Sequence, residues 1–89
     1  MGLKYAIHQV DQNQRIIVQA LEAGGCVVTS IGRPVDLLIA RHRRNHIAEV
    51  KTAKGKLRPS QAKFIASWPA PVWILRSVDD VIDFLRETD

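Results

Sequence analysis

Paired cysteines, long apolar runs and compositionally biased segments are all missing from this sequence. The single cysteine, Cys26, cannot form an internal disulfide, and its place in the apolar run 26–28 predicts a small buried side chain. No run approaches the roughly 20 apolar residues that span a bilayer, and the N-terminus lacks the pattern of a signal peptide. We therefore expect a cytoplasmic globular protein.

The length of 89 residues predicts one domain, residues 1–89, because two separate cores would each be too small to outweigh chain entropy. A domain of this size buries only about 60% of the surface of its unfolded chain. Its stability is expected to be modest, and association with a second copy would add to it.

The net charge of +4 is unevenly distributed along the chain. Residues 1–40 balance three basic against three acidic side chains, and residues 64–89 carry two basic against five acidic ones. The segment 41–63 holds one acid, Glu49, together with Lys51 and seven further basic residues: Arg41, Arg43, Arg44, Lys54, Lys56, Arg58 and Lys63. These seven form either a solvated basic face or a surface that neutralises phosphates, and the company of Glu49 and Lys51 favours the second.

The first half of the chain predicts a helix followed by three strands. Asp11 and Gln14 fit a capping box, and Gly24-Gly25 supplies a stop, so we expect a helix from Asp11 to Ala23. Three short segments rich in β-branched or aliphatic residues follow, at 26–31, 35–40 and 46–51. The short turn 41–45 makes the last two an antiparallel hairpin.

The second half predicts a helix, a strand and a final helix. Pro59 or Ser60 begins a helix that ends at Trp68, before Pro69 and Pro71. Its inward face has four members: Gln61, Phe64, Ile65 and Trp68.

The remaining elements are a strand at 72–75 and a helix capped by Ser77 and Asp80, with an apolar stripe of Val78, Ile82 and Leu85. A strand, helix, strand unit from 46 to 75 predicts a parallel crossover. The expected fold is α/β in the order αβββαβα, with a mixed four-stranded sheet.

Three charged residues are expected to meet at one end of this sheet. Glu49 and Lys51 lie on one face of their strand because side chains alternate, and the antiparallel hairpin brings Asp36 beside them. Two carboxylates can hold a hard cation such as Mg²⁺, and a nearby ammonium can orient a water or stabilise charge on phosphorus. Hydrolysis of a phosphodiester requires these features.

Each of these residues also has a plainer interpretation. Asp36 could cap a turn after Pro34, and Glu49 with Lys51 could form an exposed ion pair worth roughly 0–1 kcal/mol. Charges inside an otherwise apolar strand are expensive, however, so the joint pattern favours a site. Gln61, on an inward helical face, needs a partner that is either a backbone group or the lysine, a water or a substrate phosphate.

The chain resembles the PD-(D/E)XK nuclease superfamily, and within it the stand-alone virus-type replication-repair nucleases (VRR-NUC) of phage and bacteria. Nearly the whole chain takes part in the resemblance. The matching stretches are the opening helix 11–25, the aspartate motif 32–39, Ala48-Glu49-Val50-Lys51 as the E-x-K motif, and Ser60-Gln61 before Phe64 as the glutamine motif.

The resemblance implies a restriction-endonuclease-like fold and dependence on Mg²⁺ or Mn²⁺. It implies that Asp36, Glu49 and the Val50 carbonyl bind the metal, that Lys51 assists the attacking water, and that Gln61 supports the site. It further implies a homodimer that cuts branched DNA such as Holliday junctions, in a DNA-repair role within the bacterial cytoplasm.

Two departures from the family pattern concern the strength of the site. Val35 separates Pro34 from Asp36, whereas the family has proline directly before the aspartate. Gln14 stands where the family often has a glutamate on the first helix, which leaves Asp11 as the fallback acid. The alternative function is therefore a non-catalytic nucleic-acid-binding module that keeps the nuclease fold.

Overall fold

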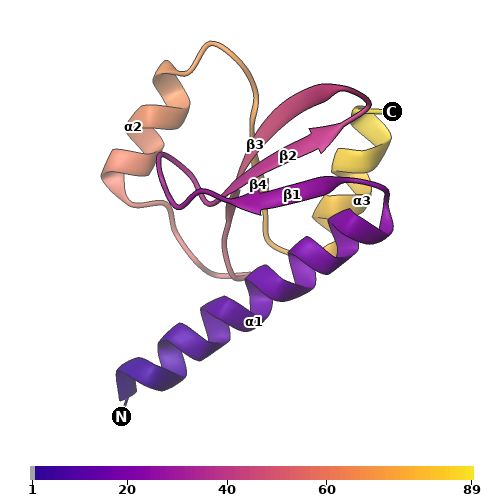
Figure 1. Cartoon of the computed structure of the whole chain (residues 1–89). Helices are drawn as coiled ribbons and strands as arrows, with labels where there is room; N and C mark the ends of the chain where they lie inside the picture. The colour runs from indigo at the N-terminus through magenta and orange to yellow at the C-terminus, as the bar shows by residue number, and fades with distance from the viewer. Residues whose placement is uncertain (1) are drawn as a thin grey trace.

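The computed structural model describes the backbone of residues 2–89 and the side chains of residues 12–89. Its elements, in chain order, are α1 (Gly2–Ala23), β1 (Val27–Ser30), β2 (Leu37–Arg41), β3 (Arg44–Val50), α2 (Pro59–Ser67), β4 (Val72–Leu75) and α3 (Val78–Glu87). The sheet order is β1-β2-β3-β4, with antiparallel pairs except for the parallel pair β3 and β4. The predicted α/β class, element order and mixed four-stranded sheet are confirmed (Figure 1).

Helices α1 and α3 cover one face of the sheet and build the core with it. Ile17 and Leu21 of α1 meet Phe84 of α3, and all three side chains are fully buried. Trp73 of β4 packs edge-on against Phe84 with ring centroids 4.9 Å apart, a favourable aromatic geometry. Cys26 is buried in the same cluster, as predicted, and burial raises the pKa of its thiol, which therefore stays protonated at neutral pH.

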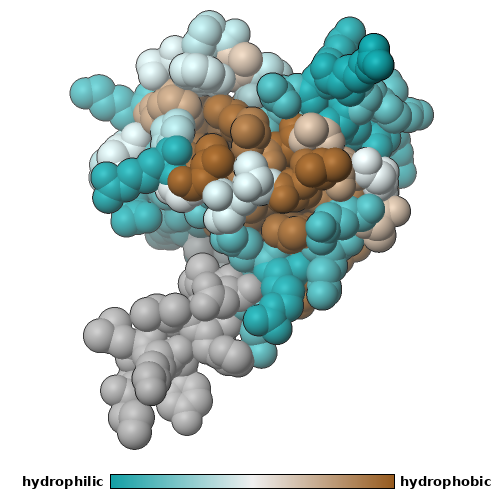
Figure 2. All heavy atoms as spheres, viewed as in Figure 1, coloured by the Kyte–Doolittle hydropathy of each residue, from teal (hydrophilic) through white to brown (hydrophobic). Residues whose placement is uncertain are grey.

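Within residues 2–89, no helix packs along the opposite face of the sheet. One row of this face crosses all four strands in register, from Thr29 through Leu38 and Ile47 to Val72. None of these four side chains is fully buried, and Val27 on the edge strand β1 is 73% exposed. We call this face of the sheet, which carries the row from Thr29 to Val72, the open face. Figure 2 shows apolar residues gathered over the middle of the molecule.

The predicted start of α1 and the predicted buried face of α3 are wrong. Helix α1 begins at Gly2, so Asp11 lies inside it and is no N-cap; residues 3–10 contain no proline or glycine to stop a helix, and the side chain of Asp11 lies outside those described. The buried face of α3 carries Val81 and Phe84, whereas Val78 and Ile82 are exposed. The sequence offers two overlapping apolar stripes on α3, and packing against α1 and β4 selects between them.

Trp68 also departs from its predicted inward position, since its side chain is 46% exposed. Helix α2 stands at the end of the sheet away from α3 and has no fully buried residue (Figure 1). Its residues Ser60, Gln61 and Phe64 border a hollow with the loop before β2, and Gln61 bonds Glu49 near the end of β3.

The β2–β3 hairpin is tighter than predicted and is anchored by Arg41. The turn consists of His42 and Arg43, both at positive φ (51° and 66°), as a two-residue turn between twisted strands requires. The Arg41 guanidinium donates to the carbonyl oxygens of Gly24 (3.0 Å) and Leu85 (3.2 Å) and to Thr88 Oγ1 (3.1 Å). Its side chain is 9% exposed. Arg41 therefore joins the hairpin to the ends of α1 and α3.

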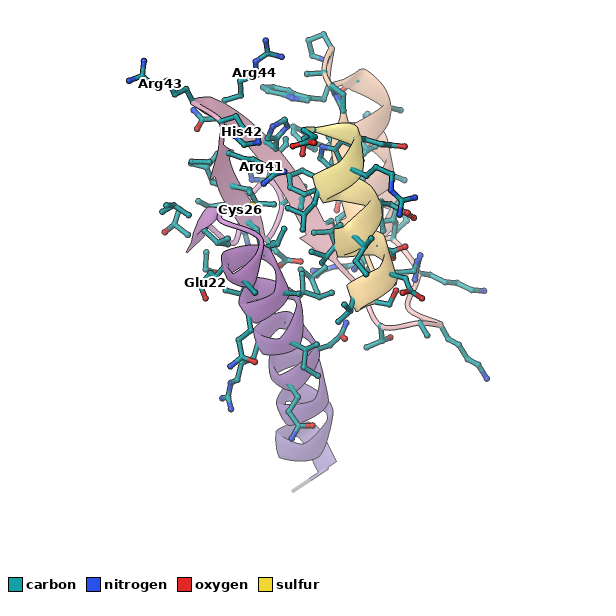
Figure 3. The ribbon with its side chains drawn as sticks, turned by 90° about the vertical axis from the view of Figure 1, so that its right-hand side faces the viewer. Glu22, Cys26, Arg41, His42, Arg43 and Arg44 are labelled. Carbon is teal, nitrogen blue, oxygen red and sulfur yellow. The ribbon has the colours of Figure 1, made fainter. Side chains whose placement is uncertain are left out.

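Figure 3 shows Arg41 pointing between α1 and α3, while Arg43 and Arg44 extend outward from the hairpin. Arg41 was predicted to belong to the nucleic-acid-binding surface, but its guanidinium is committed to these internal acceptors. A backbone carbonyl at each of two helix ends explains this position, since helix C-termini lack internal donors and favour a cation. No helix among residues 2–89 is long and apolar enough to cross a membrane.

We predict that Arg41→Ala lowers the free energy of unfolding by about 2–3 kcal/mol, because it removes four hydrogen bonds from a charged donor, including an exposed one to Asp89, and orphans two carbonyls. Arg44→Ala, at the exposed start of β3, is the matched control and should change stability by less than about 0.5 kcal/mol. Urea denaturation measures both. Equal stability of the two variants would contradict the anchoring role.

Candidate functional site

The structure brings Asp36, Glu49 and Lys51 together at one end of the open face. Leu37 pairs with Ala48, so the antiparallel register sets Asp36 opposite Glu49, one residue beyond the end of β2. The Asp36 carboxylate oxygen Oδ2 accepts a hydrogen bond of 2.8 Å from the backbone N–H of Val50. This bond ties the loop before β2 to the end of β3 and holds Asp36 beside the E-x-K segment.

Glu49 is the buried centre of the group, with 3% of its surface exposed. Its Oε2 accepts from Gln61 Nε2 at 2.7 Å and lies 3.3 Å from Lys51 Nζ. The Lys51 side chain is itself 16% exposed. The pair is therefore not the solvent-exposed ion pair that the sequence left open, and the energetic discount for surface pairs does not apply to it.

Gln61 links this carboxylate to the start of α2. Its Oε1 accepts from the backbone N–H of Arg58 at 2.9 Å, in the manner of a capping box, and its Nε2 donates to Glu49. A backbone N–H requires an oxygen acceptor, so this bond sets the amide with its NH₂ group toward Glu49. The backbone partner considered from the sequence is therefore present, and the second partner is Glu49, not the lysine, water or substrate phosphate that was expected.

The electrostatics of the group favour a cation. Burial raises the pKa of Glu49, the neighbouring Asp36 charge raises it further, and Lys51 partly opposes both effects. Two carboxylates sharing a poorly solvated place repel each other, and a divalent cation between them would relieve the repulsion. Their hard oxygen donors fit Mg²⁺ or Mn²⁺.

The donor set at this position is small. Within residues 12–89, whose side chains are described, no three His, Cys, Asp or Glu side chains converge on a point where a metal ion could sit. Asp36 and Glu49 supply two protein oxygens, so a cation here would need a backbone carbonyl and water or substrate oxygens to complete its shell. Mg²⁺ ordinarily keeps several waters and substrate phosphate oxygens in this way.

Helix α1 reaches the site through Asn13, which the sequence reasoning missed. Asn13 Nδ2 donates to the Lys51 carbonyl at 2.8 Å, and both residues line a hollow of about 200 Å³ with Thr52, Gly55 and Lys56. Asn13 lies four residues before the buried Ile17 and so shares its helical face. A polar residue on this buried face was the sequence feature that could have predicted the contact.

Gln14, the predicted first-helix contributor, lies on a different part of α1. It lines a shallow hollow together with Arg15, Val18, Gln19 and Glu22, away from the carboxylates. Successive helical residues point about 100° apart, and Asn13 takes the position toward the sheet. The contact between α1 and the site is therefore made by Asn13, which bonds the Lys51 backbone carbonyl and adds no metal ligand.

Arg76 organises the basic loop that follows Lys51. Its guanidinium donates to the carbonyl oxygens of Thr52 (2.8 Å) and Gly55 (2.5 Å), and its own N–H donates to Asp80 Oδ2. The sequence reasoning gave Arg76 no role. The loop that carries Lys54 and Lys56 is thereby fixed beside the site, with both lysines exposed.

The predicted basic surface divides into two groups, because Arg41 is internal. Arg43 and Arg44 lie at the hairpin end of β3, and Arg44 is five positions before Glu49 in extended strand, a distance of about 16 Å. The exposed group at the site end consists of Lys54, Lys56, Arg58 and Lys63, and the loop before β2 adds Arg33 to it.

We predict that Glu49→Gln raises the melting temperature of the metal-free protein. The substitution removes a buried charge whose pKa is raised, and about 1 kcal/mol corresponds to about 4–8 °C in a domain of this size. Added Mg²⁺ should stabilise the wild type and not the variant. Thermal unfolding with Glu22→Gln, an exposed carboxylate, as control tests this; a destabilised variant with a wild-type Mg²⁺ response would refute it.

No protein-family model, curated protein or solved structure matches this chain. Four side chains make up the candidate site: a buried glutamate, an aspartate fixed to the same strand, a lysine paired with the glutamate, and a glutamine that bridges it to α2.

Proposed function

We propose that this protein is a metal-dependent endonuclease that hydrolyses DNA phosphodiester bonds. The observation that carries the proposal is the buried Glu49 carboxylate, held by Lys51 and Gln61 and set opposite Asp36. A structural role alone does not account for two adjacent carboxylates at one end of this face. The exposed basic residues of segment 54–63 and Arg33 of the loop before β2 supply the positive charge that a polyanionic substrate needs.

In this proposal Asp36, Glu49 and the Val50 carbonyl hold Mg²⁺ or Mn²⁺. When bound, the cation supplies a Lewis acid that polarises the scissile phosphate and promotes deprotonation of the attacking water. Lys51, whose Nζ lies 3.3 Å from Glu49, donates hydrogen bonds that orient the water and offset charge on the phosphate oxygens. The water oxygen bonds to phosphorus as the bond to the leaving sugar oxygen breaks; the attacking water gives its proton to solvent, and the leaving oxygen takes one from solvent to become a hydroxyl. Gln61 keeps the Glu49 carboxylate in place.

The fold supports the same proposal at the level of topology. The order α1-β1-β2-β3-α2-β4-α3, with the aspartate before β2 and the E-x-K segment at the end of β3, agrees with a restriction-endonuclease-like core of the PD-(D/E)XK type. We extend the assignment to the VRR-NUC branch on the basis of the sequence motifs. A cytoplasmic DNA-repair setting follows from that assignment.

We also propose a homodimer acting on branched DNA such as a four-way junction. The open face supports self-association, because Leu38, Ile47 and Val72 are incompletely buried and Val27 is largely exposed. One chain of 89 residues carries one such site, whereas a symmetric junction needs paired cuts.

The decisive test is cleavage of four-way junction, flap and linear duplex DNA in Mg²⁺ and then in EDTA. Glu49→Ala and Lys51→Ala should lower the cleavage rate at least about 100-fold, with affinity within about threefold of wild type, because these groups act on the reacting phosphate. Glu22→Ala, an exposed carboxylate on α1, is the control and should cut normally.

Wild-type cutting by the Glu49 and Lys51 variants would refute the catalytic assignment. DNA binding without metal-dependent products from the wild type, on all three substrates, would instead establish the non-catalytic binding module.

We predict that DNA affinity falls steeply with salt and that the site-end lysines contribute to the slope. Each lost phosphate contact should reduce the slope of log affinity against log salt by about 0.9, so Lys54→Ala combined with Lys56→Ala should reduce it by about 1.8. Arg86→Ala, exposed at the end of α3, should leave it unchanged. Fluorescence anisotropy across a salt series measures the slopes; identical slopes would exclude the lysines from the interface.

A further inference from the structure

A hollow of about 380 Å³ lies beside the proposed catalytic group, between the loop before β2 and the start of α2. Its lining residues are Gly32, Arg33, Pro34, Arg58, Ser60, Gln61 and Phe64. Gln61 belongs to both places, since it lines the hollow and donates to Glu49 at 2.7 Å. Whatever occupies the hollow is therefore next to the scissile phosphate of the proposed reaction.

The charge of the hollow suits an anion. Arg33 comes from the loop and Arg58 from the residue before α2, so the two guanidinium-bearing residues lie on different walls. Neither forms an ion pair with a carboxylate among the side chains of residues 12–89, and no acidic residue lines the hollow. Two unpaired arginines around one space are suited to binding phosphate oxygens.

The hollow also has an aromatic wall. The Phe64 ring lines it and packs on the ring of Trp68, with centroids 5.3 Å apart and planes inclined by 32°. Phe64 is half-buried, so part of the ring stays accessible. An aromatic ring does not contribute to binding a bare phosphate, but it can stack on a nucleic-acid base, an interaction worth about 1–3 kcal/mol per base.

We propose that this hollow binds one unpaired nucleotide of the DNA substrate, adjacent to the scissile phosphate. Its phosphate lies between Arg33 and Arg58, and its base stacks on Phe64. A volume of about 380 Å³ is that of a small-ligand pocket and excludes a duplex. A base within a duplex is already stacked on both sides and cannot reach Phe64.

The inference rests on the proposed nuclease function and deepens it, because it gives the chain a means of selecting branched DNA. Nucleotides at flaps, gaps and junction centres can leave the stack at low cost, whereas a fully paired strand must first be opened. Selectivity then comes from shape, without any reading of base identity, since every base has a face that can stack.

The test measures binding in EDTA, so that it does not depend on cleavage. The probes are a flap DNA and a fully paired duplex of equal length, each with 2-aminopurine at the position next to the expected cut. We expect the wild type to change the 2-aminopurine fluorescence in the flap and not in the duplex. Phe64→Leu should lose that change and bind the flap about tenfold more weakly, with duplex affinity within about twofold of wild type.

Phe64→Tyr retains an aromatic ring and should restore both the fluorescence change and the flap affinity, which separates stacking from mere packing of α2. Arg33→Ala should weaken flap binding, and Arg86→Ala, exposed in the last turn of α3 and absent from the lining, should leave the fluorescence change intact. Circular dichroism spectra establish that each variant is folded.

Two results would overturn the proposal. One is wild-type flap binding and fluorescence by Phe64→Leu. The other is an equal loss of flap and duplex affinity, which would mean that the hollow holds an ordinary duplex phosphate. If the nucleotide binds as expected but no substrate is cut in Mg²⁺, the nuclease proposal fails and the binding site stands. If cutting is metal-dependent but Phe64→Leu binds the flap like the wild type, the nucleotide-binding site fails and the nuclease proposal stands.

Discussion

The burial of the Glu49 carboxylate is the constraint on which the organisation of this protein depends. A charge with 3% exposure is costly unless other groups compensate for the lost water, and here the compensation comes from two groups. Lys51 supplies charge and Gln61 supplies an amide N–H from α2. The neighbouring Asp36 adds to the cost by repulsion, and its own bond to the Val50 N–H holds it in place.

The β2–β3 hairpin links the end of the sheet with the buried Glu49 charge to the end that Arg41 and the core stabilise. At its turn, Arg41 bonds the ends of α1 and α3, and beyond it the core side chains Leu37, Ile39 and Ala48 pack against both helices. At its other end the same two strands present Asp36 and Glu49. A rigid hairpin fixed at one end can hold two repelling carboxylates in place at the other, and such support by packed elements is what a precise site requires.

The chain places its chemistry on the open face of the sheet. The face against α1 and α3 is apolar and closed, while Glu49 lies on the opposite face and, through Gln61, beside the hollow at α2. Side chains alternate along β3, so Ala48 and Val50 enter the core while the glutamate between them points to the other side. Stability and the proposed function thus use the two faces of one strand, and they compete little for the same residues.

Local patterns in the sequence determined the seven elements, the hairpin, the parallel crossover and the meeting of Asp36, Glu49 and Lys51, because strand alternation and helical spacing depend only on neighbouring residues. Gln61 was predicted in the same way, from its place on one face of α2. The start of α1 at Gly2, the buried face of α3, the exposure of Trp68, the internal position of Arg41 and the contact of Asn13 with Lys51 were decided by the tertiary structure. Each of these depends on partners far away in the chain: which of two apolar stripes is covered, or which carbonyl needs a donor, is settled only when the elements pack together.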